Sequence, residues 1–287
     1  MNLPRLLKDP PPEFAFEIAA DAIAMQRTRP PATLQKLPLA PGVLTPSPVK
    51  DNVNDPDEFA RVVKALVPTG AGRRTAALIL PDNSLRLAVL DFENLPPKEE
   101  DRLALIKFRL KKTLPFDVDE AALSTFVQKG NKVLAAVAPV EVIARYEAPF
   151  RAAGLHPGLV TCSALALLEL LPRTGSQLVA HLSPGSLTVL ALRDGVVTLA
   201  RTLELAAADD ALDEISADLY PTLIYLEDQT GHRPEKLILA GFGATADPAA
   251  TRLAVELEIP AEALNVDNPG LTGYLQSLTP TPQKAAA

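Results

Sequence analysis

The sequence has 287 residues, of which 47% are hydrophobic and 22% charged, and its formal net charge is −7. This composition is ordinary for a globular protein, and the length is sufficient for one large or two modest domains with real cores. No basic stretch alternates with aromatic residues, so the charge pattern argues against nucleic-acid binding.

A single cysteine, Cys162, excludes an internal disulfide and fits a reducing compartment. It lies in the apolar run LVTCSALALLELL, which predicts a buried, inert thiol rather than a nucleophile. The N-terminal residues MNLPRLLKDPPP have no apolar segment long enough for a signal peptide. The apolar run 159–171 is short and contains Glu169, so we expect no membrane-spanning segment and a cytosolic protein.

In the first half of the chain, apolar periodicity and turn residues predict alternating strands and helices. In chain order these are two short strands around a turn in 13–27, a helix in 55–67, a hairpin of the strands 75–80 and 85–92 around PDNS, a helix in 97–116, two strands in 121–128 and 133–139, and a helix in 139–155. Asp55 is expected to cap the first of these helices.

The second half repeats the theme of hairpins and helices. It predicts three consecutive strands in 177–183, 186–195 and 196–205, a helix in 209–231, a short strand in 236–243 that runs into a glycine turn, and a helix in 247–259. Pro221 lies within the helix 209–231 and is expected to kink or split it. The segment GAGRRT at 70–75 lacks the Lys-Ser/Thr ending of a P-loop, so we interpret it as a surface turn.

Three stretches are FEIAADAIA at 16–24, VAHLSPGSLTVLALRDG at 179–195 and LILAGFGAT at 237–245. In this order and spacing, they resemble the phosphate- and adenosine-binding loops of the actin/Hsp70-type ATPase superfamily. Within that superfamily, the intervening segments 37–66, 113–127 and 142–171 resemble PilM-like proteins of type IV pilus assembly, and Arg201 stands where that family usually has an arginine. The resemblance covers roughly residues 13–278, and the ordered set of motifs, not one motif, carries it.

The resemblance implies an α/β protein with the two-lobed actin-like (ribonuclease H-like) fold and a small α/β subdomain inserted in the first lobe. The implied division is an N-terminal extension at 1–12, a first lobe at 13–158 with an inserted subdomain at about 84–140, a second lobe at 159–278 and a flexible tail at 279–287.

The first loop departs from the family's usual Asp-Ile-Gly-Ser-Ser-Ser. Its residues are Glu17, Ile18, Ala19, Ala20, Asp21 and Ala22. A carboxylate is retained at Glu17, but the glycine that lets backbone N–H groups approach phosphate and the hydroxyls that donate to it are absent. Asp21 adds a negative charge where phosphate would lie, at a cost on the order of a few kcal/mol in a partly buried site.

The second loop, usually Asp-Ile-Gly, is His181, Leu182 and Ser183. His156 and His232 are the only other histidines and lack ligand spacing, so a structural or surface role is favoured for His181 and no metal site is expected. The third loop retains Gly241 and Gly243, which a tight strand-to-helix turn explains without a ligand. The degenerate nucleotide site therefore comprises Glu17, Ala19, Asp21, His181, Ser183, Gly241 and Gly243.

By resemblance, the expected function is that of a cytosolic scaffold at the inner face of the inner membrane, in the type IV pilus assembly platform. Its expected partners are the N-terminal cytosolic tail of a PilN-like membrane protein, bound in a groove bordered by residues 76–150, and other platform proteins. No cofactor and no ATP turnover are expected. The alternatives are an active ATPase that uses Glu17 with ATP and magnesium, or the cytosolic module of a type II secretion platform protein.

Overall fold

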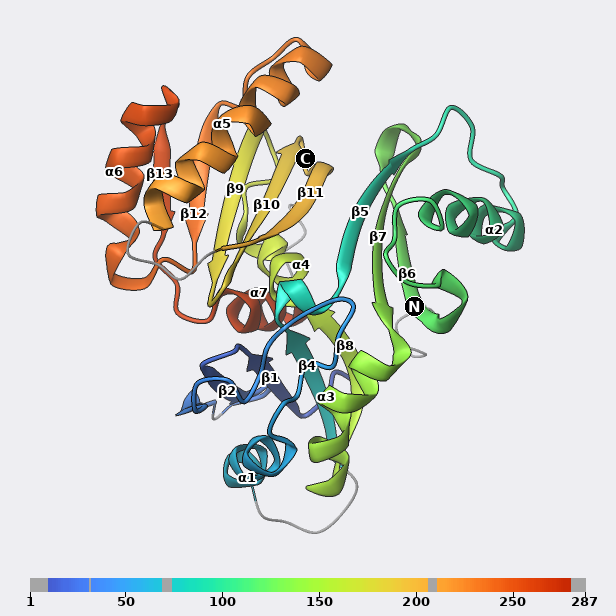
Figure 1. Ribbon diagram of the computed structural model, residues 1–287, viewed down its shortest axis with the longest axis vertical. Coiled ribbons are helices and arrows are strands. Elements are labelled where there is room, and N and C mark those ends of the chain that lie inside the picture. Colours follow the sequence, from blue (N-terminus) through green and yellow to red (C-terminus); the bar gives the residue numbers. More distant parts are fainter. Residues whose placement is uncertain (1–9, 31, 69–73, 206–210, 280–287) are drawn as a thin grey trace, which may run out of the picture.

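Two lobes and a smaller third unit make up the protein in a computed structural model that describes residues 10–30, 32–68, 74–205 and 211–279 (Figure 1). Each lobe contains a five-stranded mixed sheet, and the third unit contains a three-stranded antiparallel sheet. The predicted segment 70–75 lies mostly outside the described residues, which resume at Arg74.

The sheet of the first lobe has the strand order β3-β2-β1-β4-β8. Its strands are β1 (Phe14–Ile18), β2 (Ala22–Arg27), β3 (Gln35–Pro38), β4 (Arg74–Leu80) and β8 (Leu155–Cys162). The helices α1 (Pro56–Leu66) and α3 (Val140–Ala152) cover one face, where Phe16, Phe59 and Phe150 pack edge-to-face. Asp55 caps α1 as predicted, because its side chain accepts a hydrogen bond from the Glu58 N–H.

The sheet of the second lobe has the order β11-β10-β9-β12-β13. Its strands are β9 (Ser176–Ser183), β10 (Ser186–Arg193), β11 (Val196–Glu204), β12 (Lys236–Ala240) and β13 (Ala261–Leu264), and the helices α5 (Ala211–Thr230) and α6 (Ala246–Leu257) pack on it. In both sheets the first three strands pair antiparallel and the last two add in parallel. The two lobes therefore repeat one topology, as the predicted two-lobed fold requires.

The third unit is an inserted subdomain between β4 and α3 of the first lobe. It consists of β5 (Arg86–Asp91), α2 (Glu99–Leu110), β6 (Ala121–Val127) and β7 (Lys132–Pro139). One face of its sheet packs on α2 around Ile106 and Leu110, and the other contributes Leu134 to a core shared with both lobes. Gln128 joins it to the second lobe through two hydrogen bonds with the backbone of Val197.

The predicted hairpin of residues 75–92 is wrong. Its first strand, β4, lies in the sheet of the first lobe, whereas its second strand, β5, pairs with β7 in the inserted subdomain. The turn itself is present as the short 3₁₀ helix η2 (Asp82–Ser84), which is entirely buried. Buried polar side chains in this turn bind groups from other segments, and these contacts direct the chain from one sheet into the next.

The end of the first lobe also differs from the sequence-based outline. The strand β8 continues to Cys162, so a boundary between residues 158 and 159 falls inside it, and the short helix α4 (Ser163–Leu167) follows. The last helix, α7 (Pro269–Leu278), packs against α4 and β1 of the first lobe. Pro221 lies within α5 without splitting it; one turn earlier, the Asp218 carbonyl accepts hydrogen bonds from Thr222 and Arg201.

Candidate functional site

The predicted loop residues lie on two different sheets, at the ends of strands that meet between the lobes (Figure 1). Glu17 is in β1, Ala19 and Asp21 are in the turn to β2, His181 and Ser183 end β9, Gly241 follows β12, and Gly243 begins η6 (Gly243–Thr245). The hairpins β1–β2 and β9–β10 are thus equivalent elements of two separate lobes, as expected from the loop pattern.

Glu17 is buried and its carboxylate is already bound by the chain. It accepts hydrogen bonds from the Ser163 hydroxyl at 2.8 Å and from the backbone N–H groups of Gly270 at 3.1 Å and Leu271 at 2.9 Å. These N–H groups belong to the first turn of α7, where a helix favours a negative charge. A Cβ at residue 270 would lie 2.7 Å from the Glu17 carboxylate and 2.7 Å from the Ser163 hydroxyl. Only glycine therefore leaves room for both groups at this position.

The turn after β1 offers no comparable set of donors. The Ala19 N–H is used by the carbonyl of Ala22 within the turn, at 2.9 Å, and Asp21 is exposed. Neither position has a hydroxyl or a glycine, so the turn lacks the freely approachable backbone that phosphate loops present.

His181 pairs with Asp82 across the two lobes. Its Nδ1 lies 2.7 Å from Asp82 Oδ2, and the other carboxylate oxygen accepts a hydrogen bond from the Ala164 N–H at 2.7 Å. Both side chains are buried, with 3% of His181 and 0% of Asp82 exposed. His181, for which a structural or surface role was expected, is therefore buried and engaged by another side chain of the protein.

Two opposing effects act on the ionisation of this pair. Burial disfavours charge on both groups, yet the charge and hydrogen bond of each partner outweigh it. The pKa of Asp82 is consequently lowered and the pKa of His181 raised, so the contact favours the carboxylate form of Asp82 and the imidazolium form of His181. Asp82 was not singled out in the sequence, because a polar residue in a Pro-Asp-Asn-Ser turn normally indicates only a surface turn.

The third loop is shaped by backbone geometry. Gly241 has φ +80°, and a Cβ at that position would overlap the carbonyl oxygen of Leu182, so a tight crossing against β9 explains this glycine. Gly243 has φ +53° with nothing close to a would-be Cβ, and Ser183 is partly buried at the end of β9. Both glycines are accounted for without a ligand.

Cys162 lies beside this buried region at the end of β8 and is fully buried, as predicted. Burial raises the pKa of its thiol well above the usual value, and the nearby Asp82 charge acts in the same direction. In the described part of the chain, no group of three or more histidine, cysteine or acidic side chains is arranged to hold a metal ion.

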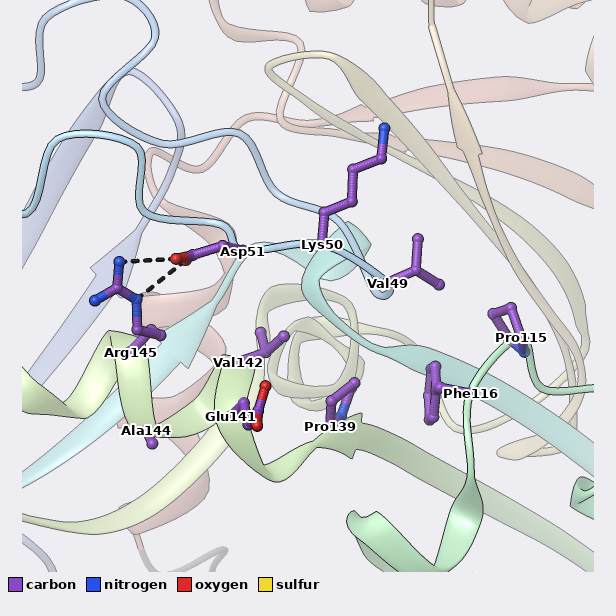
Figure 2. A pocket seen from close by; sticks show the side chains of 10 residues that line it. All are labelled: Val49, Lys50, Asp51, Pro115, Phe116, Pro139, Glu141, Val142, Ala144 and Arg145. Atoms are coloured by element: carbon purple, nitrogen blue, oxygen red, sulfur yellow. Dashed lines mark hydrogen bonds and ion pairs between the residues drawn. The ribbon is translucent and has the colours of Figure 1, made fainter.

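A groove of about 500 Å³ separates the first lobe from the inserted subdomain (Figure 2). Its walls are the loop that precedes α1, the segment that follows α2, and the start of α3. The lining residues are Val49, Lys50, Asp51, Pro115, Phe116, Pro139, Glu141, Val142, Ala144 and Arg145. Seven of these lie between residues 76 and 150, the range expected to border a partner groove, and the loop 49–51 is an additional wall that the sequence did not indicate.

The groove combines apolar side chains with charged ones, some of which form ion pairs. Asp51 and Arg145 form an ion pair of 2.7 Å at one end (Figure 2), which lowers the pKa of Asp51 through the Arg145 hydrogen bond. Within the described residues, the Glu141 carboxylate has no basic partner. It adjoins a smaller cavity that Asp117 and Glu120 also line, so this end of the groove is acidic.

Another cavity, of about 200 Å³, lies between the unpaired edges of β6 and β8 and is distinct from the one that Asp117 and Glu120 line. Its lining is mostly apolar and includes Leu123, Ser124, Ile143 and Val160. It also lies between the inserted subdomain and the first lobe, which makes it the natural competitor of the larger groove in any binding experiment.

The repeated sheets, the loops that end in the interlobe region and the inserted subdomain define an actin-like ATPase fold. Among solved structures, the chain is similar to one from the PilM–PilN type IV pilus biogenesis complex, with a TM-score of 0.75 and 20% identity over 94% of this chain and 99% of that one. This likeness confirms the predicted resemblance of the fold to PilM-like proteins. No family model and no curated protein matches the sequence.

Two further structures share the fold at lower similarity. One is a Bacteroides thetaiotaomicron protein of actin-like ATPase fold and unknown function, with a TM-score of 0.57 and 11% identity over 91% of this chain and 94% of that one. The other is the cytoplasmic domain of EpsL, an inner-membrane component of the Vibrio cholerae type II secretion system, with a TM-score of 0.55 and 11% identity over 92% and 93%. Among the described residues, no helix has the length and apolarity needed to cross a bilayer.

Proposed function

We propose that this protein is a cytosolic scaffold of a type IV pilus assembly platform, which binds the cytosolic tail of a PilN-like membrane protein and does not turn over ATP. The observation that carries the proposal is the groove between the first lobe and the inserted subdomain, in a fold similar to that of the PilM–PilN complex.

The chemistry of the groove suits an extended peptide. Phe116, Val142 and the prolines offer apolar surface that can hold the side-chain anchors of a peptide. The unpaired Glu141 carboxylate favours a basic residue at the acidic end. The tail is therefore expected to carry apolar anchors and one lysine or arginine.

The interlobe loops support a scaffold without nucleotide chemistry. Glu17 would have to give up hydrogen bonds to Ser163, Gly270 and Leu271 before it could organise magnesium and water. His181, in the place of a second acid, is engaged by Asp82. A ligand must compensate for every internal bond it displaces, and each bond lost by a buried charged group costs on the order of 1.5–3 kcal/mol.

The test uses the membrane protein encoded next to this gene. A synthetic peptide of its N-terminal cytosolic residues is titrated against the purified chain by calorimetry, with and without magnesium-ATP. We expect micromolar binding that ATP does not change, because a ligand shifts an equilibrium only through differential affinity for two states. Binding that requires ATP, or an ATP-dependent rise in melting temperature that Glu17→Ala abolishes, favours the active ATPase instead.

Three variants locate the peptide. Ala144 is exposed and lines the groove, so A144R is expected to block binding. Ala148 is exposed on the same helix one turn further and does not line the groove, so A148R is the matched control. Ser124 lines the cavity between the edges of β6 and β8. If S124R abolishes binding while A144R does not, the peptide lies in that cavity and our assignment of the groove is wrong.

A further inference from the structure

The helix α2 forms the outermost layer of the inserted subdomain, on the side away from both lobes (Figure 1). Its inner face is anchored in the subdomain core by Ile106 and Leu110, which are fully buried. Its outer face presents Phe108, whose side chain is 58% exposed. More than half of this large aromatic side chain therefore faces water, although the helix that carries it is well anchored.

Basic residues flank Phe108 in the sequence. The segment 107–112 contains Lys107, Arg109, Lys111 and Lys112 and no acidic residue, in a chain whose net charge is −7. Lys107 and Lys111 share a single carboxylate, that of Asp119, at 3.2 Å and 2.6 Å. The four basic residues and Phe108 are called the α2 patch below.

The remaining cations of the α2 patch have aromatic rather than acidic neighbours. The Lys112 Nζ lies 4.9 Å from the centre of the Phe108 ring, and the Arg109 guanidinium lies 5.4 Å from that of Phe92. Neither has a carboxylate partner among the described residues. The patch thus retains positive charge beside an exposed ring, the combination that interfacial segments present to lipid headgroups.

We propose that the α2 patch binds the surface of a membrane that contains anionic phospholipids. Charge complementarity favours this occupant, and so does continuity with the groove, because α2 runs through Lys111 and Lys112 into Pro115 and Phe116 of the groove wall. In this respect the inference rests on the proposed function. A tail that is bound in the groove and continues into a bilayer brings the end of α2 close to the headgroups.

The test is flotation of the full chain with vesicles of phosphatidylcholine alone or mixed with phosphatidylglycerol. We expect binding only to the mixed vesicles and its loss at high salt, because screening shortens the reach of surface charges. Each basic residue near an anionic surface strengthens binding about fivefold. K111E/K112E is therefore expected to weaken binding by well over tenfold, and F108S to weaken it at every salt concentration at which the unmodified chain binds.

The matched control reverses two exposed lysines elsewhere. Lys36 on β3 and Lys64 on α1 are exposed in the first lobe, so K36E/K64E changes the net charge equally and is expected to retain binding. Soluble glycerol phosphate is added to distinguish a lipid surface from a free phosphate, and no competition is expected. Equal losses in both double variants, full competition, binding to neutral vesicles or no binding to anionic vesicles each overturn the proposal.

Tail binding separates this inference from the proposed function. The α2 patch does not line the groove, so K111E/K112E is expected to bind the tail peptide as the unmodified chain does. Vesicle binding without tail binding rejects the proposed function and leaves the α2 patch supported. Tail binding without vesicle binding does the reverse.

Discussion

The imidazole of His181 in the second lobe and the carboxylate of Asp82 in the first lobe form an ion pair of 2.7 Å that is almost completely shielded from water. This contact joins the lobes beside the first and second loops, which contain Glu17 and Ser183. Separation of the lobes therefore breaks a buried pair in which each group holds the other in its charged form, and the Glu17 carboxylate adds a second negative charge near His181.

Breaking this pair from one side is expected to be costly. H181Q leaves the Asp82 carboxylate buried without a cation, so the free energy of unfolding should fall by on the order of 3–5 kcal/mol. The double variant D82N/H181Q should lose distinctly less, because no uncompensated charge remains. Denaturant unfolding gives both values. E169Q, which breaks the exposed Glu169–Arg173 pair of the same 2.7 Å length, is the control and should cost under about 1 kcal/mol. Similar losses in H181Q and the double variant would contradict this.

The same pair predicts a defined pH dependence. The raised pKa of His181 contributes stability that is complete below its unfolded value of about 6.5 and is lost as pH rises through the folded pKa. The lowered pKa of Asp82 contributes stability above its unfolded value of about 3.9, which is lost at lower pH. The difference in unfolding free energy between the unmodified chain and D82N/H181Q should therefore be largest between these values and should shrink toward alkaline pH.

Glu17 is expected to matter for the seating of α7. In E17Q the amide NH₂ would face backbone N–H groups that now donate hydrogen bonds to the carboxylate. We therefore expect the free energy of unfolding to fall by on the order of 2 kcal/mol. Amide exchange should accelerate in residues 269–278 before it does so elsewhere in the first lobe. E13Q changes an exposed glutamate just before the same strand and should leave exchange unaltered. Uniform acceleration throughout both lobes in E17Q would argue against a specific role in docking α7.

Two buried tyrosines should respond oppositely to loss of the hydroxyl. Tyr146 shares hydrogen bonds with Ser84 at 3.0 Å and Asn52 at 3.1 Å, so Y146F should destabilise by about 1 kcal/mol or more. The Tyr274 hydroxyl is buried without a protein partner, so Y274F should be neutral or stabilising. The melting temperatures of Y146F and Y274F, measured side by side with that of the unmodified chain, check both expectations. A clear loss of stability in Y274F would mean that the hydroxyl is bound after all.

Cys162 should be unreactive in the native protein. Its thiol is fully buried and its raised pKa suppresses the thiolate, which is the reactive form. Labelling with an aromatic disulfide reagent should proceed no faster than global unfolding and should become rapid in denaturant. A cysteine introduced at exposed Ser124 serves as the accessible control. Fast native labelling at Cys162 would show that β8 opens locally.

Apolar periodicity predicted most of the helices and strands, because their buried faces follow the helical or strand repeat, as in Phe59, Val62 and Val63 of α1. It failed at residues 75–92, where a tight turn joins two strands of different sheets. The local sequence contains no signal for this, since the choice depends on what β5 can pair with more than 40 residues later.

The site was predictable where resemblance pointed to single residues and not where it depended on distant partners. Glu17 and His181 were identified as altered loop positions. However, the backbone N–H groups that donate hydrogen bonds to Glu17 lie 253 and 254 residues further along the chain. Asp82 was missed because its partner His181 is 99 residues away. Burial converts such residues from turn formers into charge partners, and burial follows only from the assembled lobes.

The contact between β1 and α7 also sets an order of events during synthesis. Ala15, Ala77 and Ile79 on one face of the first sheet are covered by Leu271 and Tyr274 of α7, which the ribosome adds only after the strands of the second lobe. Until then the nascent first lobe exposes an apolar sheet face while the entire second lobe is still being made. Contacts between residues this far apart in the sequence form slowly and leave an aggregation-prone intermediate. Newly made chains should therefore depend on chaperones more than the size of either lobe suggests.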